Sequence, residues 1–448
     1  MAGSINIAII GGGISGSAFL YELASINQGK DQHFKIDLYD QGRGLGGRSS
    51  HRYVKEANRI FQFDHGCQFF RGDTPTMHNF ISKFMESKVI MEWRGKFVAH
   101  PSTAEADTCD FFGMPSKGPF YVAAGGMHNF PLHLVDAAKK MEGKNTVINV
   151  HPATRVAKLV PKAGKWCLEG VGGHAAFHDT KESIAKRATH NYLNDGEGYD
   201  LVVLTDISST SFDSWHRASA GVPDSFSKMI KEKVGSRVPL FAAMVAFEMP
   251  LPVNKAESIT FPSRDGNDCW FAAKTNSKPG FDHLIPECWT IVSTASYAAK
   301  EIKDVPMQDE KTGEFLPQEP DYLKKGPATH LLSSFLKAMN ISKSDTPKIL
   351  HISAQRWGSA LPAARHLATD KSSSTRKYIG GVAYDIGQGA LAPTKIEGTD
   401  DTPFCYDKTL NLLQIGDMVS NLTVGMESAV VSAVQAAAFV ASLSGKKK

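Results

Sequence analysis

One short stretch constrains this chain more than any other: an apolar run followed at once by closely spaced glycines. Residues 5–10 (INIAII) have the composition of a buried parallel strand, and residues 14–26 carry apolar side chains at helical spacing. The turn between them matches G-x-G-x-x-G, with its glycines at Gly11, Gly13 and Gly16. This pattern permits a tight turn, a close backbone approach to a pyrophosphate and close packing of helix on strand. The stretch therefore predicts dinucleotide binding at the first helical turn, which begins with Ile14 and Ser15.

A second apolar segment, residues 34–39, ends at an acidic residue. Asp40 lies 24 residues beyond Gly16, close to the spacing at which an acidic side chain accepts hydrogen bonds from the ribose hydroxyls of adenosine. Asp37 is the alternative, but it lies inside the predicted strand, whereas Asp40 lies at its carboxyl end. We therefore predict that Asp40 and the adjacent Gln41 face the adenosine half of the cofactor.

Size and composition fit a globular protein of two domains. The 448 residues exceed the size at which a single core stops growing. Hydrophobic residues make up 42% and charged residues 21%, and the net charge of +4 is too small to indicate nucleic-acid binding. This charge does not exclude small acidic molecules as ligands.

Cysteine and histidine spacing gives no sign of a metal. The six cysteines are scattered without a CxxC pair, which is typical of reduced thiols in a cytosolic protein, and the sixteen histidines are equally dispersed. The N-terminus lacks a basic signal region, and no uninterrupted apolar run reaches the ~18 residues of a membrane span. We expect a soluble, cytoplasmic protein with no membrane, nucleic-acid or metal partner.

Two further segments favour FAD over a nicotinamide nucleotide. The first is a second glycine pair ending in an arginine, Gly46, Gly47 and Arg48, which offers close backbone approach and a bidentate cation for phosphate. The second is a strand, turn and helix at the C-terminus, where residues 410–415 lead to Gly416 and Asp417, and Gly425 precedes a helix starting at Met426. An aspartate at the strand end suits ribityl hydroxyls or the pyrophosphate, and the helix N-terminus suits the electron-rich edge of a reduced flavin.

The motifs GGGISG, LYDQGRGLGGR and IGDMVS…TVGMESAV together resemble the flavin-containing amine oxidase superfamily. Within it, the stretches FDHGCQFF, CWFAAKTNSKPG, CWTIVSTASYA and AQRWGSALP are similar to the renalase-like branch. The resemblance implies an α/β fold: a Rossmann-like (GR2-type) FAD-binding domain and a second α+β substrate domain built on a mainly antiparallel sheet. It also implies noncovalent FAD, since Cys405 has no sequence context for a flavin linkage.

The resemblance implies that both domains are discontinuous. We assign residues 1–75, 121–212 and 405–448 to the FAD-binding domain, and residues 76–120 and 213–404 to the substrate domain. Residues 200–205 and 147–156 read as strands of the first domain, and residues 239–249 as a strand of the second. Two polar stretches, 173–198 and 300–325, lack apolar periodicity and are expected to be surface insertions.

Several residues are candidates for the flavin and substrate sites. The resemblance places Gln68 beside the flavin ring, although its amide would equally satisfy backbone groups. Lys278 is a candidate cation near the flavin or a solvated hairpin lysine, and Arg356 and Trp357 are candidates for the substrate wall, with Trp357 equally suited to the core. The remaining cofactor candidates are His65, Gly66 and Val156.

The functional expectation is an FAD-dependent oxidase resembling renalase. It would take hydride from a small donor, for which a dihydronicotinamide isomer of NAD(P)H is one candidate, and pass the electrons to molecular oxygen. A flavin amine oxidase acting on a small amine is the alternative enzyme, and a redox-silent flavin-binding scaffold is the alternative of another class. The physiological substrate and the oligomeric state stay open.

Overall fold

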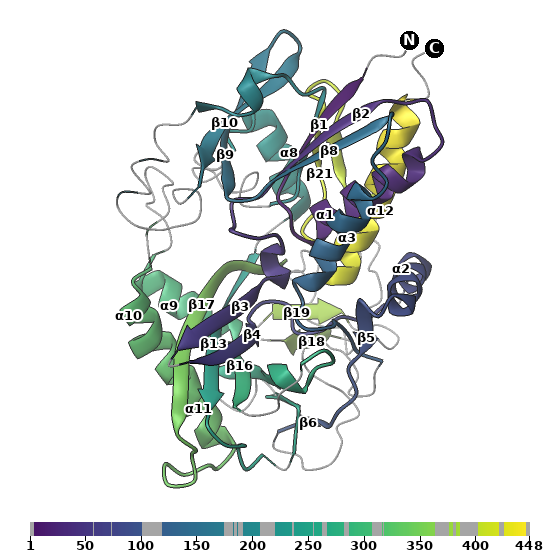
Figure 1. Cartoon of the computed structure of the whole chain (residues 1–448). Helices are drawn as coiled ribbons and strands as arrows, with labels where there is room; N and C mark the ends of the chain where they lie inside the picture. The colour runs from purple at the N-terminus through teal and green to yellow at the C-terminus, as the bar shows by residue number, and fades with distance from the viewer. Residues whose placement is uncertain are drawn as a thin grey trace.

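The computed structural model places two β-sheets one above the other (Figure 1). It describes residues 4–56, 58–72, 74–100, 119–173, 182, 186, 191–206, 220–234, 237–253, 255–261, 267–281, 286–306, 316, 318–362, 376–379, 382–385, 402–420 and 425–444. Cys109, one of the six cysteines that we expect to be reduced thiols, lies outside these residues.

The first sheet has six strands in the order β20-β21-β12-β1-β2-β8. Its central strands pair in parallel, and only β20 runs antiparallel to its neighbour. Strands buried on both faces have continuous apolar sequences, which is why INIAII and LVVL form its middle. The strands are β1 (Ile5–Ile10), β2 (Phe34–Tyr39), β8 (Thr146–His151), β12 (Leu201–Leu204), β20 (Cys405–Asp407) and β21 (Leu412–Gln414).

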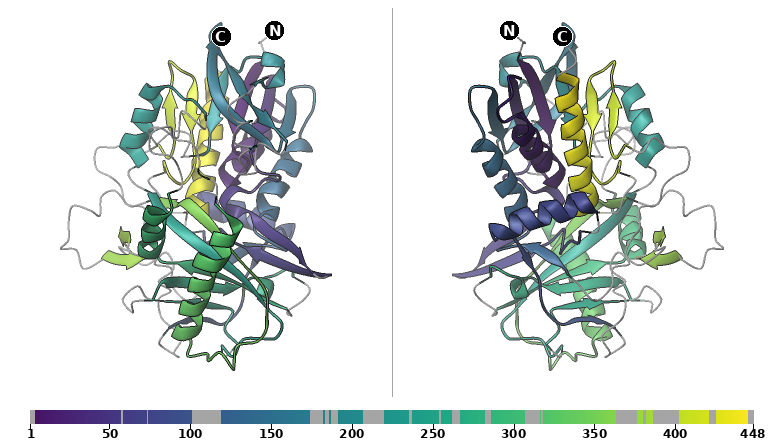
Figure 2. Two further views of the ribbon diagram at one scale, coloured as in Figure 1. Left: turned by 90° about the vertical axis from the view of Figure 1, so that its left-hand side faces the viewer. Right: turned by 90° about the vertical axis from the view of Figure 1, so that its right-hand side faces the viewer.

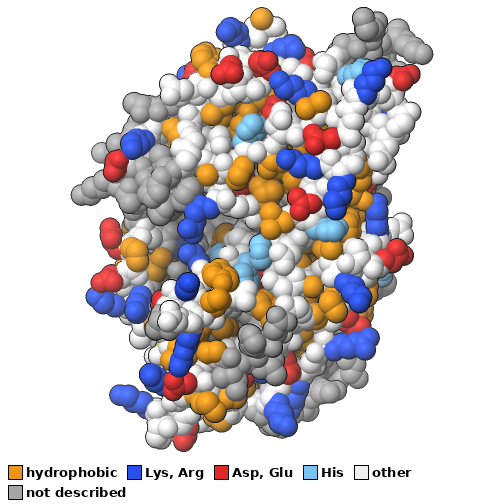
Figure 3. All heavy atoms as spheres, in the orientation of Figure 1, with side chains coloured by type: hydrophobic (Ala, Val, Ile, Leu, Met, Phe, Trp, Pro, Cys, Tyr) orange, Lys and Arg blue, Asp and Glu red, His pale blue; other side chains and the backbone are white. Residues whose placement is uncertain are grey.

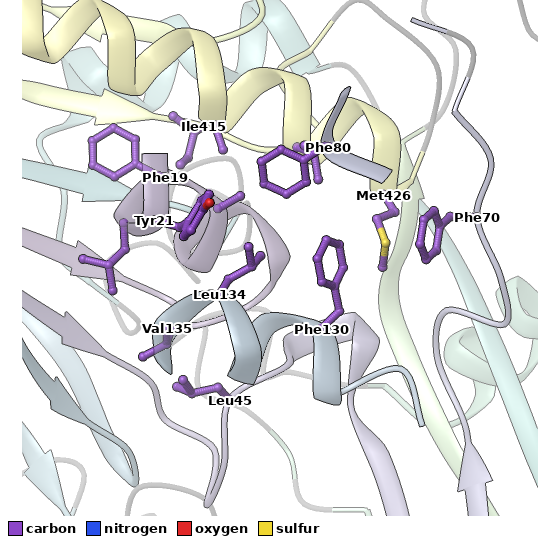
Figure 4. Packing of buried hydrophobic residues seen from close by; sticks show 14 of the residues in the cluster. Phe19, Tyr21, Leu45, Phe70, Phe80, Phe130, Leu134, Val135, Ile415 and Met426 are labelled. Atoms are coloured by element: carbon purple, nitrogen blue, oxygen red, sulfur yellow. The ribbon is translucent and has the colours of Figure 1, made fainter. Parts of the chain in front are cut away.

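Helices cover one face of this sheet, and a mixed layer covers the other (Figures 1 and 2). The first face carries α1 (Ile14–Asn27), α3 (Asn129–Lys139) and α12 (Met426–Ser444), which share one hydrophobic core (Figure 4). The second face carries α8 (Asp224–Val234) and a three-stranded sheet, which share a second core. That sheet consists of β9 (Thr154–Lys162), β10 (Lys165–Gly172) and β11 (Asn191–Tyr192).

Helix α12 is long and apolar enough to cross a membrane by length and composition alone. Its segment Met426–Leu443 has a mean hydropathy of 1.5, and 61% of that segment is buried inside the protein. Val430, Ala433 and Ala437 pack in the same core as Phe19 and Leu23 of α1. These contacts are those of a core helix, and they explain its apolar composition.

The second sheet is mainly antiparallel, with the order β17-β13-β16-β15-β14-β6. Only β14 and β6 pair in parallel. A helical layer packs on it, where Trp289 lies against Phe335 with ring centroids 5.7 Å apart. The strands are β6 (Phe97–Ala99), β13 (Arg237–Phe247), β14 (Ser258–Thr260), β15 (Cys269–Lys274), β16 (Glu287–Ser293) and β17 (Ile349–Pro362), and the helices are α9 (Ala295–Asp304), α10 (Pro320–Leu323) and α11 (Thr329–Ala338), with a π-helical turn at Lys324–Ala328.

Smaller elements connect the two sheets. The hairpin of β3 (His51–Glu56) and β4 (Arg59–Asp64) packs its Phe61 and Phe63 against Met244 and Cys288 of the second sheet. Helix α2 (Pro75–Glu86) lies across one end of α12 (Figure 2). The remaining pairs are β5 (Ile90–Glu92) with β7 (Tyr121–Ala123), and β18 (Arg376–Ile379) with β19 (Val382–Asp385).

The strands of the two sheets fall within the chain segments predicted for the two domains, but three elements pack across the boundaries. Helix α8 lies in the chain segment predicted for the substrate domain, yet its Phe226 packs with Val202 of the first sheet. Helix α2 packs its Phe84 on Tyr21 of α1, with ring centroids 5.5 Å apart. The β3–β4 hairpin lies in the predicted cofactor segment but packs on the second sheet.

The polar stretch 300–325 contains more regular structure than its sequence indicated. Helix α9 continues to Asp304, and α10 begins at Pro320. The buried apolar residues of α9, Tyr297 and Ala298, lie just before residue 300. The stretch that begins at residue 300 therefore shows no apolar periodicity, although it contains the end of this helix. In the other stretch, 173–198, the described residues include β11, which pairs with β10.

Gly16 provides a test of the strand–turn–helix packing. A Cβ at this position would lie 2.0 Å from the carbonyl oxygen of Gly11. We expect Gly16→Ala to lower the free energy of unfolding by about 1–3 kcal/mol, because relieving the overlap must move backbone. Urea unfolding of the cofactor-free protein measures this, with Gly143→Ala as the control, since a Cβ at Gly143 meets nothing within 4 Å. Equal stability of the two variants would contradict the close packing.

Candidate cofactor and substrate site

The glycine-rich turn after β1 has the backbone that its sequence predicted. Gly11 has φ +106°, and a Cβ there would lie 2.1 Å from Thr205 Oγ1. Gly13 is the N-cap residue of α1 and supplies no capping side chain, so the helix begins without a side-chain acceptor for its first amides. The first turn of α1, at Ile14, Ser15 and Gly16, is therefore suited to an anionic ligand.

Asp40 lies at the carboxyl end of β2, as predicted, and its carboxylate holds the turn together. Its Oδ2 accepts from Gly12 N at 2.7 Å, and its Oδ1 accepts from Gly42 N at 2.6 Å. The side chain is buried rather than exposed, and this burial raises the pKa of Asp40 to about 6. Each oxygen keeps a lone pair, so the carboxylate retains capacity for hydroxyl donors.

Two other residues near Asp40 differ in their surroundings. Asp37 is fully buried and accepts from Asn149, Tyr199 and His151, which fixes it as a structural residue. Gln41 is exposed, and its Oε1 accepts from Arg155 Nη1 at 2.7 Å. Val156 is buried in the core behind β2, two residues after Thr154, whose amide donates to Asp40 O at 2.8 Å.

The second glycine pair packs directly on the first turn. Gly46 N donates to Gly12 O at 3.0 Å, and Gly46 forms an isolated bridge with Gly13. Gly47 has φ +53°, and a Cβ there would lie 3.3 Å from Gly13 Cα. The two glycine loops thus touch backbone to backbone, which side chains on either loop would prevent.

The C-terminal segment reaches the same place. A Cβ on Gly416, which has φ +121°, would lie 3.4 Å from Ser15 Oγ. Asp417 is buried and forms a two-point ion pair with Arg48, in which Nη1 donates to Oδ2 at 2.8 Å and Nη2 donates to Oδ1. Arg48 Nη1 also donates to Ala360 O of β17 at 3.0 Å. Two predicted cofactor residues are therefore partners of each other, and they join both ends of the chain to the second sheet.

At the start of α12, the backbone of Gly425 and the side chain of Met426 have different surroundings. Gly425 has φ +83°, and a Cβ there would meet no atom of the described residues within 4 Å. The side chain of Met426 instead points into the hydrophobic core between Phe70 and Phe130 (Figure 4). Only the backbone of Met426 remains as a candidate ligand contact.

Asp64, which sequence reasoning missed, is the hub of a buried polar cluster. Its Oδ1 accepts from Met127 N at 2.9 Å and lies 2.9 Å from His51 Nδ1. Its Oδ2 accepts from Lys278 Nζ at 2.9 Å, and both side chains of this pair are at most 1% exposed. The surrounding cations and donors hold the pKa of Asp64 well below its usual range despite its burial. The only signal in the sequence is its place in the FDHGCQFF motif.

The two candidates Gln68 and Lys278 both belong to this cluster. Gln68 Nε2 donates to the carbonyl oxygens of Asp64 at 2.5 Å and Gly66 at 3.1 Å, so its amide serves backbone groups. Lys278 Nζ also lies 3.4 Å from Gln68 Oε1 and 5.4 Å from the ring centroid of Trp93. Lys278 is thus a fixed, buried cation and not a solvated hairpin residue.

His65 and Gly66 pack between the GGR loop and the second sheet. A Cβ on Gly66 would lie 2.1 Å from Arg48 O. The ring of His65 stacks on Trp357 with centroids 5.4 Å apart and an interplanar angle of 17°, and Trp357 Nε1 donates to His65 O at 2.8 Å. Burial lowers the pKa of His65 to about 3, so the ring is neutral, and its buried Nδ1 has no hydrogen-bond partner among the described residues.

Arg356 is not brought together with the other candidates. It neighbours Trp357 on β17, and adjacent strand residues point to opposite faces of a sheet. Its Nη1 donates to Val305 O at 2.7 Å, and its Nε lies 2.8 Å from the side-chain amide of Gln318. This placement gives Arg356 a structural role behind the sheet and does not support the predicted role in the substrate wall.

No group of three or more His, Cys, Asp or Glu side chains in the described ranges is arranged to hold a metal ion. The five cysteines within those ranges form no disulfide. Cys405 is buried in β20, and burial raises the pKa of the Cys67 thiol to about 12, so Cys67 is a protonated packing residue.

Comparison with known protein families gives a match near the N-terminus of the chain. Residues 9–84 match the NAD(P)-binding Rossmann-like domain family. No curated protein sequence matches.

Solved structures share the fold over almost the whole chain. Putrescine oxidase bound to putrescine has 10% identity and a TM-score of 0.53, covering 98% of this chain and 99% of the other. Reduced UDP-galactopyranose mutase has 12% identity and a TM-score of 0.55, covering 99% and 95%. An oxidoreductase from Methanosarcina mazei has 9% identity and a TM-score of 0.52, covering 96% and 99%. The fold is therefore a Rossmann-like domain with a second domain. Since oxidases and a mutase share it, the fold alone does not fix the reaction.

The Asp64–Lys278 pair predicts a strongly non-additive mutant cycle. Asp64→Asn leaves a buried, uncompensated ammonium, so we expect a loss of about 3–5 kcal/mol in the free energy of unfolding. Adding Lys278→Met should restore part of that loss, as measured by urea unfolding of the single and double variants. Asp321→Asn is the control, because the Lys325–Asp321 pair is exposed and worth about 0–1 kcal/mol. Additive losses would contradict a tight buried pair.

Proposed function

We propose that this protein is an FAD-dependent oxidoreductase that oxidises a small hydride donor and passes the electrons to dioxygen. One observation carries the proposal: segments from near the two ends of the chain meet beyond the carboxyl ends of β1 and β21 of the first sheet, where Gly416 lies against Ser15 and Asp417 pairs with Arg48. A long dinucleotide held from both ends fits this arrangement. The shared fold with putrescine oxidase and the Methanosarcina mazei oxidoreductase supports a redox role.

The residues present fit FAD. The uncapped first turn of α1 and the two touching glycine loops suit the pyrophosphate, and Asp40 suits the adenosine ribose. Asp417 and the backbone at Gly425 suit the flavin half. Cys405 is buried within its strand, which supports noncovalent binding.

The described side chains suit a donor that is already reduced. A bound flavin accepts a hydride and supplies the two electrons for dioxygen. Overall, a dihydronicotinamide, dioxygen and one proton give the aromatic nicotinamide cation and hydrogen peroxide, a conversion that needs no strong base on the protein. His65 is neutral with a pKa of about 3, and Asp64 is locked to Lys278, so neither is a good base at neutral pH.

Amine oxidation is the second candidate, favoured by the shared fold with putrescine oxidase. A small amine is largely protonated in water and is best held by a buried carboxylate or an aromatic cage. Here the buried carboxylates of Asp64 and Asp417 are each already paired with a cation. The reduced nicotinamide donor therefore fits these charges better. A redox-silent scaffold would hold the same cofactor without being reduced.

We also propose a cytoplasmic location. The absence of disulfides among the described cysteines supports it, because buried thiols persist in a reducing compartment.

The raised pKa of Asp40 predicts that the affinity for FAD depends on pH. Its carboxyl is protonated below a pKa of about 6 and ionised above it, and only the ionised form accepts fully from ribose hydroxyls. The dissociation constant for FAD should therefore be about tenfold weaker at pH 5 than at pH 7.5. Equilibrium fluorescence titration measures it, with Asp40→Asn as the control, which should bind more weakly with no such step near pH 6. The same step in both proteins would contradict a role for this carboxyl.

Anaerobic mixing separates the three functions. The purified protein should be yellow, and the 2- and 6-dihydro isomers of NAD(P) should bleach its visible absorbance within seconds. The oxidised dinucleotide is the negative control, and putrescine is the amine arm. Admission of air should restore the colour and release one equivalent of hydrogen peroxide per donor. Bleaching by amines alone would favour the second candidate, and no bleaching by either would favour the scaffold.

A further inference from the structure

A turn before α3, residues 124–128, packs on the second glycine loop. A Cβ on Gly46, which has φ +139°, would lie 3.6 Å from Cβ of His128. The ring of His128 stacks on that of His51 with centroids 5.0 Å apart. Gly126 lies against both rings, because a Cβ there would be 2.9 Å from His51 Nδ1 and 3.0 Å from His128 Nδ1. Turn 124–128 therefore supports the second glycine loop and the start of β3.

The same turn also contacts residues 278–280, which form a turn after β15 of the second sheet. Gly125 N donates to Pro279 O at 2.9 Å. Gly280 has φ +85°, and a Cβ there would lie 2.2 Å from Gly125 N. The next residue, Phe281, stacks its ring on His51 with centroids 5.9 Å apart. The two turns thus meet backbone to backbone.

A series of backbone contacts therefore leads from the first glycine turn to the second sheet. The first glycine turn touches the second glycine loop, the loop touches turn 124–128, and that turn touches turn 278–280. Asp64 also binds Met127 of one turn and Lys278 of the other. Figure 3 shows histidine side chains at the surface between the two sheets, at the level where β3 begins in Figure 1. Because backbone in contact cannot yield by rotating a side chain, a displacement of one turn is passed to the next.

We propose that Gly280 is a positioning residue for the cofactor: by docking turn 278–280 on turn 124–128, it holds the second glycine loop in place for the pyrophosphate of FAD. The inference rests on the proposed function and adds a means of regulation to that site, because retention of FAD then depends on docking of the second sheet. Coupling between two binding events is reciprocal, so bound FAD also tightens the contact between the two turns. Gly280 acts through turn 124–128 and takes no part in the redox reaction.

The first test is the dissociation constant for FAD of the Gly280→Ala apoprotein, measured by fluorescence titration. The added methyl overlaps backbone, so the turns must separate, and we expect FAD to bind about tenfold more weakly. Gly164→Ala is the matched control: Gly164 has φ +75°, but a Cβ there meets no atom of the described residues within 4 Å. It carries the same backbone strain without the overlap and should keep the wild-type affinity.

The affinity for FAD, set beside urea unfolding of the apoprotein, separates positioning from a purely structural role. A Gly280→Ala protein that is less stable but binds FAD with the wild-type dissociation constant would overturn the proposal. If Gly280→Ala does not fold, Phe281→Ala takes its place, since it removes the ring stacked on His51. We expect about fivefold weaker FAD binding for Phe281→Ala and wild-type binding for Phe281→Tyr, which keeps the ring. Wild-type affinity in Phe281→Ala would then overturn the proposal.

Hydrogen exchange tests the reciprocal effect without any redox reaction. The amide of Gly125 donates to Pro279 O, so the exchange of its peptide, followed by mass spectrometry, reports docking of the two turns. Saturating FAD should slow this exchange about tenfold in the wild type and leave it unchanged in Gly280→Ala. No slowing in the wild type, or equal slowing in both proteins, would overturn the proposal.

The outcome is separable from that of the proposed function. If FAD slows the exchange in the wild type alone but dihydronicotinamides do not bleach the flavin, the oxidoreductase function fails and the positioning role of Gly280 stands. If the donors bleach the flavin but Gly280→Ala binds FAD as the wild type does, the function stands and the positioning role is overturned.

Discussion

The buried carboxylate of Asp64 is the interaction on which the arrangement of the two halves depends. It belongs to β4, and it binds the turn before α3 through Met127 N, the β3 strand through His51 and the loop after β15 through Lys278. Its own carbonyl accepts from Thr290 of β16. Because an unpaired buried charge is costly, all of these elements must come together for any of them to be stable. The hub therefore ties the second sheet to the β3–β4 hairpin and to the turn before α3.

The ion pair of Arg48 and Asp417 likewise joins distant segments, next to the second glycine loop. Their ion pair spans 369 residues of sequence, and Arg48 also binds the carbonyl of Ala360 on β17. This pair brings the N-terminal loop, the C-terminal turn and the second sheet to one point through contacts made by the protein alone. A preorganised site loses less conformational entropy on binding, which favours tight, noncovalent retention of a long cofactor.

Local sequence predicted the parts of the structure that depend on local constraints. The strand INIAII, the strand ending at Asp40 and the glycine turn were predictable because only glycine tolerates φ +106° at Gly11 and the overlap at Gly16. The ion pairs were not, because Lys278 and Asp64 are 214 residues apart and neither neighbourhood marks its partner. The sequence also does not show side-chain direction: Arg356 points behind its sheet, and Met426 points into the core, although both lie in segments that reach the site.

The charges that remain after these pairings decide which ligand the site suits. Asp64 is neutralised by Lys278 and Asp417 by Arg48, so neither buried carboxylate is available to hold a cationic substrate. Arg52, by contrast, has only the neutral amide of Gln355 as its hydrogen-bond partner among the described residues. A fold shared by oxidases and a mutase leaves the substrate open, so the substrate depends on the side chains of this chain's own site.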